Sequence, residues 1–331
     1  MSGPPPLREG QLVAAVRVWR VEYDRTGGPE VLVWREAALA APGRGEVRVA
    51  VRAASVNPVD GKIRAGLLPP LPSAFPAGTG RDGAGLVVGL GADVDPVWLG
   101  RRVAFLAPRS GPGTWAEAVN LPVAVLAEIP ETVNDLVAAA LPLVGQSAEA
   151  VLAAGGVSLG ADARGKRVLI HAAAGGVGRA AVQLAWLAGA EVHATASSAR
   201  RPALEALGCA RVWAYDEGED FTALREVDLV IDLLGGAVHD RSYTVLRRGG
   251  IFACLKAAPF RDRGTEFDVQ VVVAEVVPDG ALLVRLLALV VAGRLDLGPE
   301  RVLPATAFVE AQRLSDSGHA GGKIVLDFGA E

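Results

Sequence analysis

One stretch of the chain, residues 164–201, limits its fold more than any other. An apolar run at 168–172 is short enough for one buried strand, and small residues fill the turn at 173–178. Apolar side chains then repeat at helical spacing, at Val177, Ala181, Leu184, Ala185 and Ala188. After Gly189, residues 191–196 form a second strand-like run. The order strand, glycine turn, helix and strand predicts the first unit of a dinucleotide-binding parallel sheet.

The turn has the pattern Ala173-x-Gly175-x-x-Gly178, with a further glycine at 176. Glycines in such turns let the chain turn tightly, let the backbone approach a pyrophosphate and let the helix pack on the strand. The N–H groups at the start of the helix then hold the phosphates. We predict that the backbone binds the pyrophosphate at Ala174, Gly175, Gly176, Val177 and Gly178. A tight strand–helix turn without a ligand is the alternative.

The end of the second predicted strand indicates which dinucleotide binds. An NAD site usually has an acidic residue about 20 residues after the glycines, which holds the ribose 2′-OH. Residues 195–198 lie there and include no carboxylate, and two arginines follow. Hydroxyl and guanidinium groups favour a 2′-phosphate. We therefore predict NADP(H) as cofactor, with the phosphate held by Ser197, Arg200 and Arg201. The alternative is that both arginines are surface residues at the start of a helix.

Composition excludes several other classes of protein. The 331 residues suggest about two domains, and a hydrophobic content of 51% is ample for large cores. A formal net charge of −4 without a basic tract argues against a nucleic-acid partner. Cys209 and Cys254 are too few for a disulfide scaffold or a four-cysteine metal site. We see no membrane-spanning run and no signal peptide, so we expect a cytoplasmic protein without a membrane partner.

The remaining sequence divides into a β-rich first part, an α/β middle and a returning tail. Alternating residues at 16–21 and 47–52 predict strands, and a helix broken at Pro142 is predicted over 131–152. Further strands are predicted at 212–215, 229–232, 251–255, 267–274 and 323–328, with a helix at 281–292. Strands that alternate with helices indicate a parallel sheet. We predict one domain from residues 1–124 and 275–331, and a cofactor domain from residues 125–274.

Seven short motifs carry a resemblance to a known family. They are SVNPVDGK at 55–62, GRDGAG at 80–85, GTWAE at 113–117, LPL at 141–143, HAAAGGVG at 171–178, DLLGG at 232–236 and GKIVL at 322–326. In this order the chain resembles the medium-chain dehydrogenase/reductase superfamily, and within it the zinc-free quinone oxidoreductase and enone reductase branch, which includes zeta-crystallin. The resemblance implies an α/β fold with a Rossmann-type doubly wound parallel sheet and a β-rich GroES-like domain. It also implies a homodimer paired through the strand at 267–274.

The resemblance implies no catalytic zinc. Zinc-dependent members carry a cysteine ligand where this chain has Asn57 and a histidine where it has Arg81, and zinc needs ligands of the Cys, His or carboxylate kind. We expect His171 and His193 to be satisfied core residues. His239 and His319 lie in loop or helix-end sequence without a second ligand in register.

The resemblance also marks further cofactor residues. Tyr215 matches a tyrosine near the ribose phosphate, Ser147 a hydroxyl near the nicotinamide, and Lys323 a lysine near the cofactor. A half-buried strand-end aromatic, a helix-interior hydroxyl and a surface lysine are the respective alternatives. A different argument adds Leu233, Gly235 and Leu255, because they follow predicted strand ends, where open α/β sheets bind ligands.

Asn57 and Lys62 are the candidate catalytic residues. Asn57 stands at the metal-ligand position and could donate to a substrate oxygen, although a turn-capping asparagine before Pro58 would look the same. Lys62 could stabilise an enolate oxygen or hold the nicotinamide ribose, and a solvated lysine is the alternative. Asp60 and Asp82 are expected to fix turns or to pair with Arg64 or Arg81. Residues 67–72 could form an apolar pocket wall or pack under the first domain.

The resemblance implies NADPH-dependent, zinc-independent reduction of a quinone or an α,β-unsaturated carbonyl, with a small apolar electrophile as substrate. Such an electrophile is already activated, so the protein need only bind, orient and exclude water. Two alternatives stay open. The motif at 171–178 also resembles the enoyl reductase domains of polyketide synthases, which act on enoyl thioesters. The branch also contains non-catalytic NADPH-binding or structural proteins.

Overall fold

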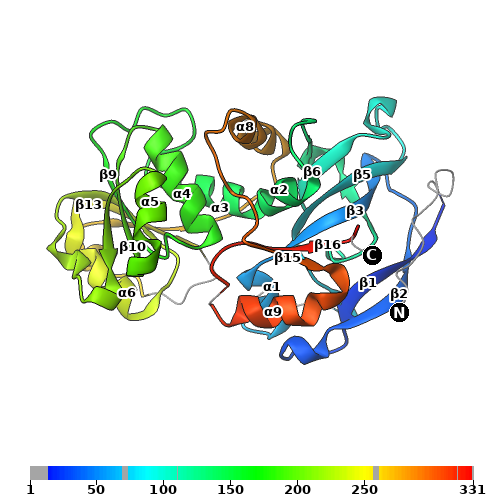
Figure 1. Ribbon diagram of the computed structural model, residues 1–331, viewed down its shortest axis with the longest axis horizontal. Helices are drawn as coiled ribbons and strands as arrows, with labels where there is room; N and C mark the ends of the chain where they lie inside the picture. The colour runs from blue at the N-terminus through cyan, green and yellow to red at the C-terminus, as the bar shows by residue number, and fades with distance from the viewer. Residues whose placement is uncertain (1–13, 69–73, 110, 256–260, 319, 330–331) are drawn as a thin grey trace. The chain divides into compact units, whose positions relative to one another are not determined.

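The computed structural model describes residues 14–68, 74–109, 111–255, 261–318 and 320–329, and they form two compact units (Figure 1). The first unit is Met1–Leu143, Val277–Gly293 and Leu297–Glu331; the second is Val144–Val276 and Arg294–Asp296. The predicted boundary at residue 124 differs from this division. Residues after 124 stay with the first unit because helix α2 (Asp135–Ala140) packs on its strands, and Nη2 of Arg102 donates to Oδ1 of Asp135 at 2.7 Å.

The second unit is built on a six-stranded parallel sheet. Its strands are β9 (Arg167–Ile170), β10 (Glu191–Ala196), β11 (Cys209–Ala214), β12 (Val227–Asp232), β13 (Leu246–Leu255) and β14 (Gln270–Ala274). They lie in the order β11-β10-β9-β12-β13-β14, and every pair is parallel. Counted along the chain this is 3-2-1-4-5-6, the strand order of a Rossmann-type sheet. The predicted fold of the cofactor domain is therefore confirmed.

One helix precedes the first strand of this sheet, and the other helices follow its strands. They are α3 (Pro142–Ala154), α4 (Gly176–Leu187), α5 (Arg201–Ala206), α6 (Gly236–Ser242) and α7 (Gly264–Phe267), with short 3-10 turns η4 (Ser198–Arg200), η5 (Tyr215–Glu217), η6 (Phe221–Ala223) and η7 (Tyr243–Val245). Helix α4 packs on β9 and β10, and α5 packs on β11 (Figure 1). One buried cluster gathers Leu169, Trp213, Phe221, Tyr243 and Phe252. Such burial matches the apolar strands that a helix-covered parallel sheet needs.

The first unit is mostly antiparallel β-structure. Its strands are β1 (Val16–Tyr23), β2 (Val33–Leu39), β3 (Glu46–Val56), β4 (Ala77–Gly78), β5 (Asp82–Leu90), β6 (Arg102–Leu106), β7 (Ala118–Pro122), β8 (Leu126–Glu128), β15 (Arg301–Pro304) and β16 (Ile324–Asp327). They form one sheet in the order β2-β1-β4 and another in the order β15-β16-β3-β5-β6-β8, where β7 also pairs with β3. This confirms the β-rich domain.

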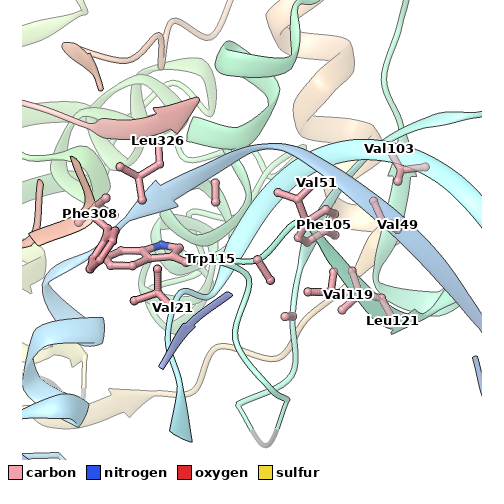
Figure 2. Packing of buried hydrophobic residues seen from close by; sticks show 14 of the residues in the cluster. Val21, Val49, Val51, Val103, Phe105, Trp115, Val119, Leu121, Phe308 and Leu326 are labelled. Atoms are coloured by element: carbon pink, nitrogen blue, oxygen red, sulfur yellow. The ribbon is translucent and has the colours of Figure 1, made fainter. Parts of the chain in front are cut away.

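Helices and 3-10 turns complete the first unit. They are α1 (Pro58–Arg64), α2, α8 (Gly280–Val291) and α9 (Phe308–Asp316), with η1 (Pro29–Val31), η2 (Pro96–Trp98), η3 (Val123–Val125) and η8 (Ala305–Ala307). The tail belongs here because α9 and β16 contribute to its core. Figure 2 shows Phe308 and Leu326 beside Trp115 and Val21. Trp115 is buried, and its Nε1 donates to the carbonyl of Ser55 at 3.0 Å.

Two predicted elements differ from the structure. The strand predicted over 267–274 begins only at Gln270, because Phe267 ends helix α7 and Asp268 takes a left-handed φ of 55°. The helix predicted from 131 begins at Asp135, since Asn134 caps it by accepting from the N–H of Val137 at 2.8 Å. Within the residues that the structure describes, no helix is long and apolar enough to cross a membrane.

Candidate active site

The glycine turn joins β9 to α4 and has the geometry that the sequence predicts. Ala172 takes a left-handed φ of 52°, and its carbonyl accepts from the N–H of Gly175 at 3.0 Å. A Cβ added to Gly178 would lie 2.3 Å from the oxygen of Ala172, so glycine is needed there for the helix to approach the strand. A Cβ added to Gly175 would meet only that oxygen, at 3.3 Å. Gly175 therefore has little packing reason to be glycine, which fits close approach by a ligand.

The start of α4 supplies the donors for an anion. Gly175 is the N-cap, and the carbonyl of Gly175 accepts from the N–H of Arg179 at 2.8 Å. The first N–H groups of a helix have no partner within the helix, and they carry the positive end of its dipole. A pyrophosphate fits this donor set, so the residues from Ala174 to Gly178 are suited to hold a dinucleotide.

The segment after β10 lies at the same edge of the sheet as the glycine turn. Ser197 is the N-cap of η4, and Tyr215 begins η5 at the end of β11, where its side chain is 68% exposed. Asp216 accepts from Ser198 twice, from the N–H at 2.7 Å and from Oγ at 2.8 Å. Nη2 of Arg201 donates to Glu217 at 2.9 Å and to Glu219 at 2.6 Å. The guanidinium predicted to hold a phosphate is thus already paired with two carboxylates.

Asp232, the last residue of β12, organises the next loop of this edge. Its Oδ1 accepts from the N–H groups of Leu234 at 2.8 Å and of Gly235 at 3.0 Å. Nδ1 of buried His239 donates to its Oδ2 at 2.8 Å. These bonds hold the segment with Leu233 and Gly235 next to the glycine turn, because β12 pairs with β9. Leu255 ends the neighbouring strand β13 at the same edge.

His171 is a satisfied core histidine, as predicted. Ser242 Oγ donates to the carbonyl of Val238 at 2.6 Å, so it accepts from Nε2 of His171 at 2.8 Å. Nδ1 of His171 then accepts from Thr195 Oγ1 at 2.9 Å. This assigns the neutral Nε2–H tautomer, and burial lowers the pKa of His171 to about 4. His193 is also buried, on β10, with Nε2 2.7 Å from Glu191, but its Nδ1 has no hydrogen-bond partner among the described residues, so the prediction that it is satisfied holds for Nε2 alone.

In the first unit, Asn57 joins strand β3 to helix α1 and lies in a buried polar cluster. Its N–H donates to Oδ2 of Asp60 at 2.9 Å, which fixes the start of the helix. Its amide nitrogen donates to Ser55 Oγ at 3.1 Å and to Oδ1 of Asp82 at 2.8 Å. Its amide oxygen accepts from Nζ of Lys323. Every polar group of the Asn57 side chain therefore has a partner inside the cluster.

The cluster is charged as well as buried. Asp82 also accepts from the N–H of Leu143 at 2.9 Å and from Ser55 Oγ, and its Oδ2 lies 4.0 Å from Nζ of Lys323. Burial raises the pKa of Asp60 to about 7. Burial also lowers the pKa of Lys323, an effect that the carboxylates of Asp82 and Asp60 oppose. Lys323 is thus an internal cation and not the surface lysine that was the alternative.

Comparison with known proteins identifies the family. Residues 43–131 match the model of the alcohol dehydrogenase GroES-like domain, and residues 207–326 match that of a zinc-binding dehydrogenase. The structure is similar to a quinone oxidoreductase from Coxiella burnetii, with TM-score 0.87 and 31% identity, over 94% of this chain and 99% of that one. The chain belongs to the quinone oxidoreductase-like branch of the medium-chain dehydrogenase/reductase superfamily.

Two further similarities extend the family description. An Escherichia coli quinone oxidoreductase complexed with NADPH has a TM-score of 0.83 and 25% identity, over 93% of this chain and 99% of that one. The polyketide synthase GfsB of Streptomyces halstedii is 39% identical over 254 residues, which are 74% of this chain and 4% of the synthase. The chain therefore spans only a small part of the polyketide synthases that it matches.

The residues at the metal-ligand positions of zinc-dependent family members do not fit zinc. An amide with all its polar groups paired and the guanidinium of Arg81 are not zinc ligands. Among the described residues, no group of three or more His, Cys, Asp and Glu side chains is arranged to hold a metal. His319 is outside the described residues.

The other predicted residues lie on both units. Lys62 is on α1 and partly buried, and burial lowers the pKa of its amine. Ser147 is buried on α3. Asp60 fixes a turn, which is one of the two predicted roles, and Nη2 of Arg64 donates to Asp316 at 2.8 Å. Within the apolar segment 67–72, Leu68 is buried and Leu67 exposed, and residues 69–72 are outside the described residues.

Sequence reasoning missed three contacts of the candidate site. Asp216 comes from the 3-10 turn η5 after the neighbouring strand β11, and not from the strand end where a carboxylate was sought. His239 was expected at a loop or helix end and is buried against Asp232. Lys323 reaches Asn57 from 266 residues away. The aspartate before Leu-Leu-Gly-Gly was the one local signal, because a strand-end carboxylate before glycines commonly caps a loop.

Proposed function

We propose that this protein is an NAD(P)H-dependent, zinc-independent oxidoreductase that reduces a quinone or an α,β-unsaturated carbonyl. The observation that carries the proposal is that the two metal-ligand positions hold Asn57, whose amide is fully paired with Ser55, Asp82 and Lys323, and Arg81, and neither side chain is a zinc ligand. The glycine turn after β9 supplies the other requirement, which is a binding site for the dinucleotide. The family and the similarity to quinone oxidoreductases support the same activity.

A bound reduced nicotinamide dinucleotide supplies the hydride. The chain's own residues hold and orient it: the turn from Ala174 to Gly178 for the pyrophosphate, and Leu233, Gly235 and Leu255 along the same sheet edge. A quinone or enone has an electron-poor carbon and needs no Lewis acid, so positioning and a hydrogen-bond donor to the substrate oxygen suffice for hydride transfer. The enolate or hydroquinonate that forms then takes up a proton. We assign that donor to Lys62. Asn57 cannot donate while both of its amide hydrogens are held by Ser55 and Asp82.

The proposal includes two finer points. NADPH is accepted through Ser197 and Arg200, and Tyr215, Ser147 and Lys323 are assigned to the cofactor by resemblance alone. The protein forms a homodimer through β14, which is an edge strand of the six-stranded sheet and carries Val273 with 41% of its surface exposed.

Reduction of an enoyl thioester is the second candidate. The observation that favours it is the 39% identity to a polyketide synthase, together with the resemblance of residues 171–178 to enoyl reductase domains. The chemistry is the same conjugate reduction, so the residues assigned above serve both candidates. Only the acceptor distinguishes them.

The test is oxidation of NADPH and NADH against four acceptors, with and without a chelator: 9,10-phenanthrenequinone, a benzoquinone, an alkyl enone and crotonyl-CoA. We expect chelator-insensitive turnover of a quinone or the enone. Preferred turnover of crotonyl-CoA would select the second candidate. Loss of activity with chelator, restored by zinc, would contradict the proposal. Dinucleotide binding without turnover of any acceptor would instead favour a non-catalytic binding protein.

A further inference from the structure

Carboxylate side chains from the segment after β11 lie beside the end of β10. Residues 195–201 contain none, but η5 follows β11 and brings Asp216, Glu217 and Glu219 to this place. Asp216 accepts both the N–H and the hydroxyl of Ser198. These hydrogen bonds lower the pKa of Asp216, so its carboxylate is ionised at neutral pH.

The same acidic segment pairs with the second arginine. Nη2 of Arg201 lies between Glu217 and Glu219, and Glu219 is itself anchored by the N–H of Ala214 at 3.2 Å. A 2′-phosphate that used Arg201 would have to displace these carboxylates or lie beside them. The phosphate and these carboxylates are all negatively charged and would repel each other at close range, and this repulsion would weaken the binding of NADPH.

Rossmann-type sites for NAD place a carboxylate at the end of the second strand, where it accepts from the ribose 2′-OH. In this sheet the second strand is β10, and Ser198 lies two residues beyond its end. Asp216 places its carboxylate against Ser198, although Asp216 follows a different strand, β11. The site therefore combines a carboxylate, which is typical of an NAD site, with arginines, which are typical of an NADP site.

We infer that Asp216 is a specificity-determining residue of the dinucleotide site, which accepts the 2′-OH of NADH and disfavours the 2′-phosphate of NADPH. As a result the protein binds NADH about as well as NADPH. This inference rests on the proposed function only in requiring that a reduced nicotinamide dinucleotide binds.

The test measures dissociation constants for NADH and NADPH by titration calorimetry, without any acceptor, in the parent protein and in Asp216→Asn. Asparagine can still accept from the N–H of Ser198 through Oδ1, and its Nδ2 can donate to Oγ of Ser198, so the variant removes the charge and keeps the fold, which a melting curve checks. The matched control is Asp220→Asn. Asp220 lies in the same acidic segment, but its carboxylate accepts from Thr222 and Arg241 instead.

We expect the parent protein to bind NADPH no more than about tenfold more tightly than NADH. Asp216→Asn should shift the ratio of the two constants toward NADPH by about fivefold or more, and Asp220→Asn should not. A larger NADPH preference in the parent, a smaller shift in Asp216→Asn or an equal shift in the control would each overturn the inference. These outcomes leave the proposed reductase intact, whereas failure to bind either dinucleotide would overturn both.

Discussion

The ammonium of Lys323 donates a hydrogen bond to the amide oxygen of Asn57, although 266 residues separate them. The contact places a positive charge inside the first unit, 4.0 Å from the carboxylate of Asp82. Lys323 is 8% exposed and Asp82 is fully buried. A charge without its partner is costly at such depth, so the two residues depend on each other.

Replacement of Lys323 by methionine should lower the free energy of unfolding by about 3 kcal/mol, because Asp82 would keep its buried charge without the cation. Urea unfolding measures the loss. Lys323→Met with Asp82→Asn should recover part of it. Arg44→Met is the surface control, since Arg44 pairs with Asp93 in an exposed ion pair and should change stability little. Equal effects at positions 323 and 44 would contradict the buried pairing.

The two glycines of the dinucleotide turn should respond differently to alanine. Gly178→Ala places a methyl group against the backbone of Ala172 and should cost about 1–3 kcal/mol of stability. Gly175→Ala meets only the backbone oxygen of Ala172, at 3.3 Å, so it should cost much less stability than Gly178→Ala. It should weaken NADH and NADPH binding about tenfold or more, because the ligand must approach that backbone. Unchanged affinity in Gly175→Ala would place the pyrophosphate elsewhere.

Acidification should destabilise the fold through His171. Its folded pKa of about 4 lies below the unfolded value of 6.5, so the unfolded chain binds the extra proton. This contribution to stability is complete above pH 6.5 and is lost as the pH falls toward 4, by up to about 3 kcal/mol. Unfolding curves of the parent and of His171→Gln from pH 4 to pH 8 measure it. The stability difference between the two proteins should shrink as the pH falls, and a constant difference would show that His171 does not titrate as stated.

Lys62→Met should lower kcat for a quinone or enone about 100-fold, since it removes the proposed donor to the substrate oxygen. Binding of NADPH, measured separately, should change much less. Lys62→Arg keeps the charge and should restore part of the rate. If Lys62→Met retains full kcat, Lys62 takes no part in the reaction.

The edge strand β14 should hold two subunits together. Light scattering should give twice the chain mass of 34.1 kDa, and Val273→Lys should yield monomers because a lysine on that edge opposes pairing. Val302→Lys, at an equally exposed valine on β15, should leave the dimer intact. A monomeric parent protein would contradict the proposed assembly.

The sequence predicted what local chemistry determines. The glycines of 175–178 and the short apolar run at 168–172 specify the dinucleotide unit, because turn geometry and burial depend on neighbouring residues. Contacts between distant segments were not predictable in this way. Asp216 reaches Ser198 only because β11 lies beside β10, and Lys323 reaches Asn57 only because β16 lies beside β3. Phe267 was predicted to begin the strand at 267–274, yet its ring stacks on Tyr243 from a helical turn.

The pairing of β16 with β3 has a consequence for how the chain folds during synthesis. Val325 lies opposite Ser55, so the ribosome makes the whole second unit before the sheet of the first unit can acquire these two strands as neighbours. The second unit can fold as soon as it emerges, since domains fold as units. The first unit cannot complete its sheet until β16 has been made, and until then Asp82 lacks the ammonium of Lys323. A truncation before residue 323 should therefore leave the second unit folded and the first unfinished.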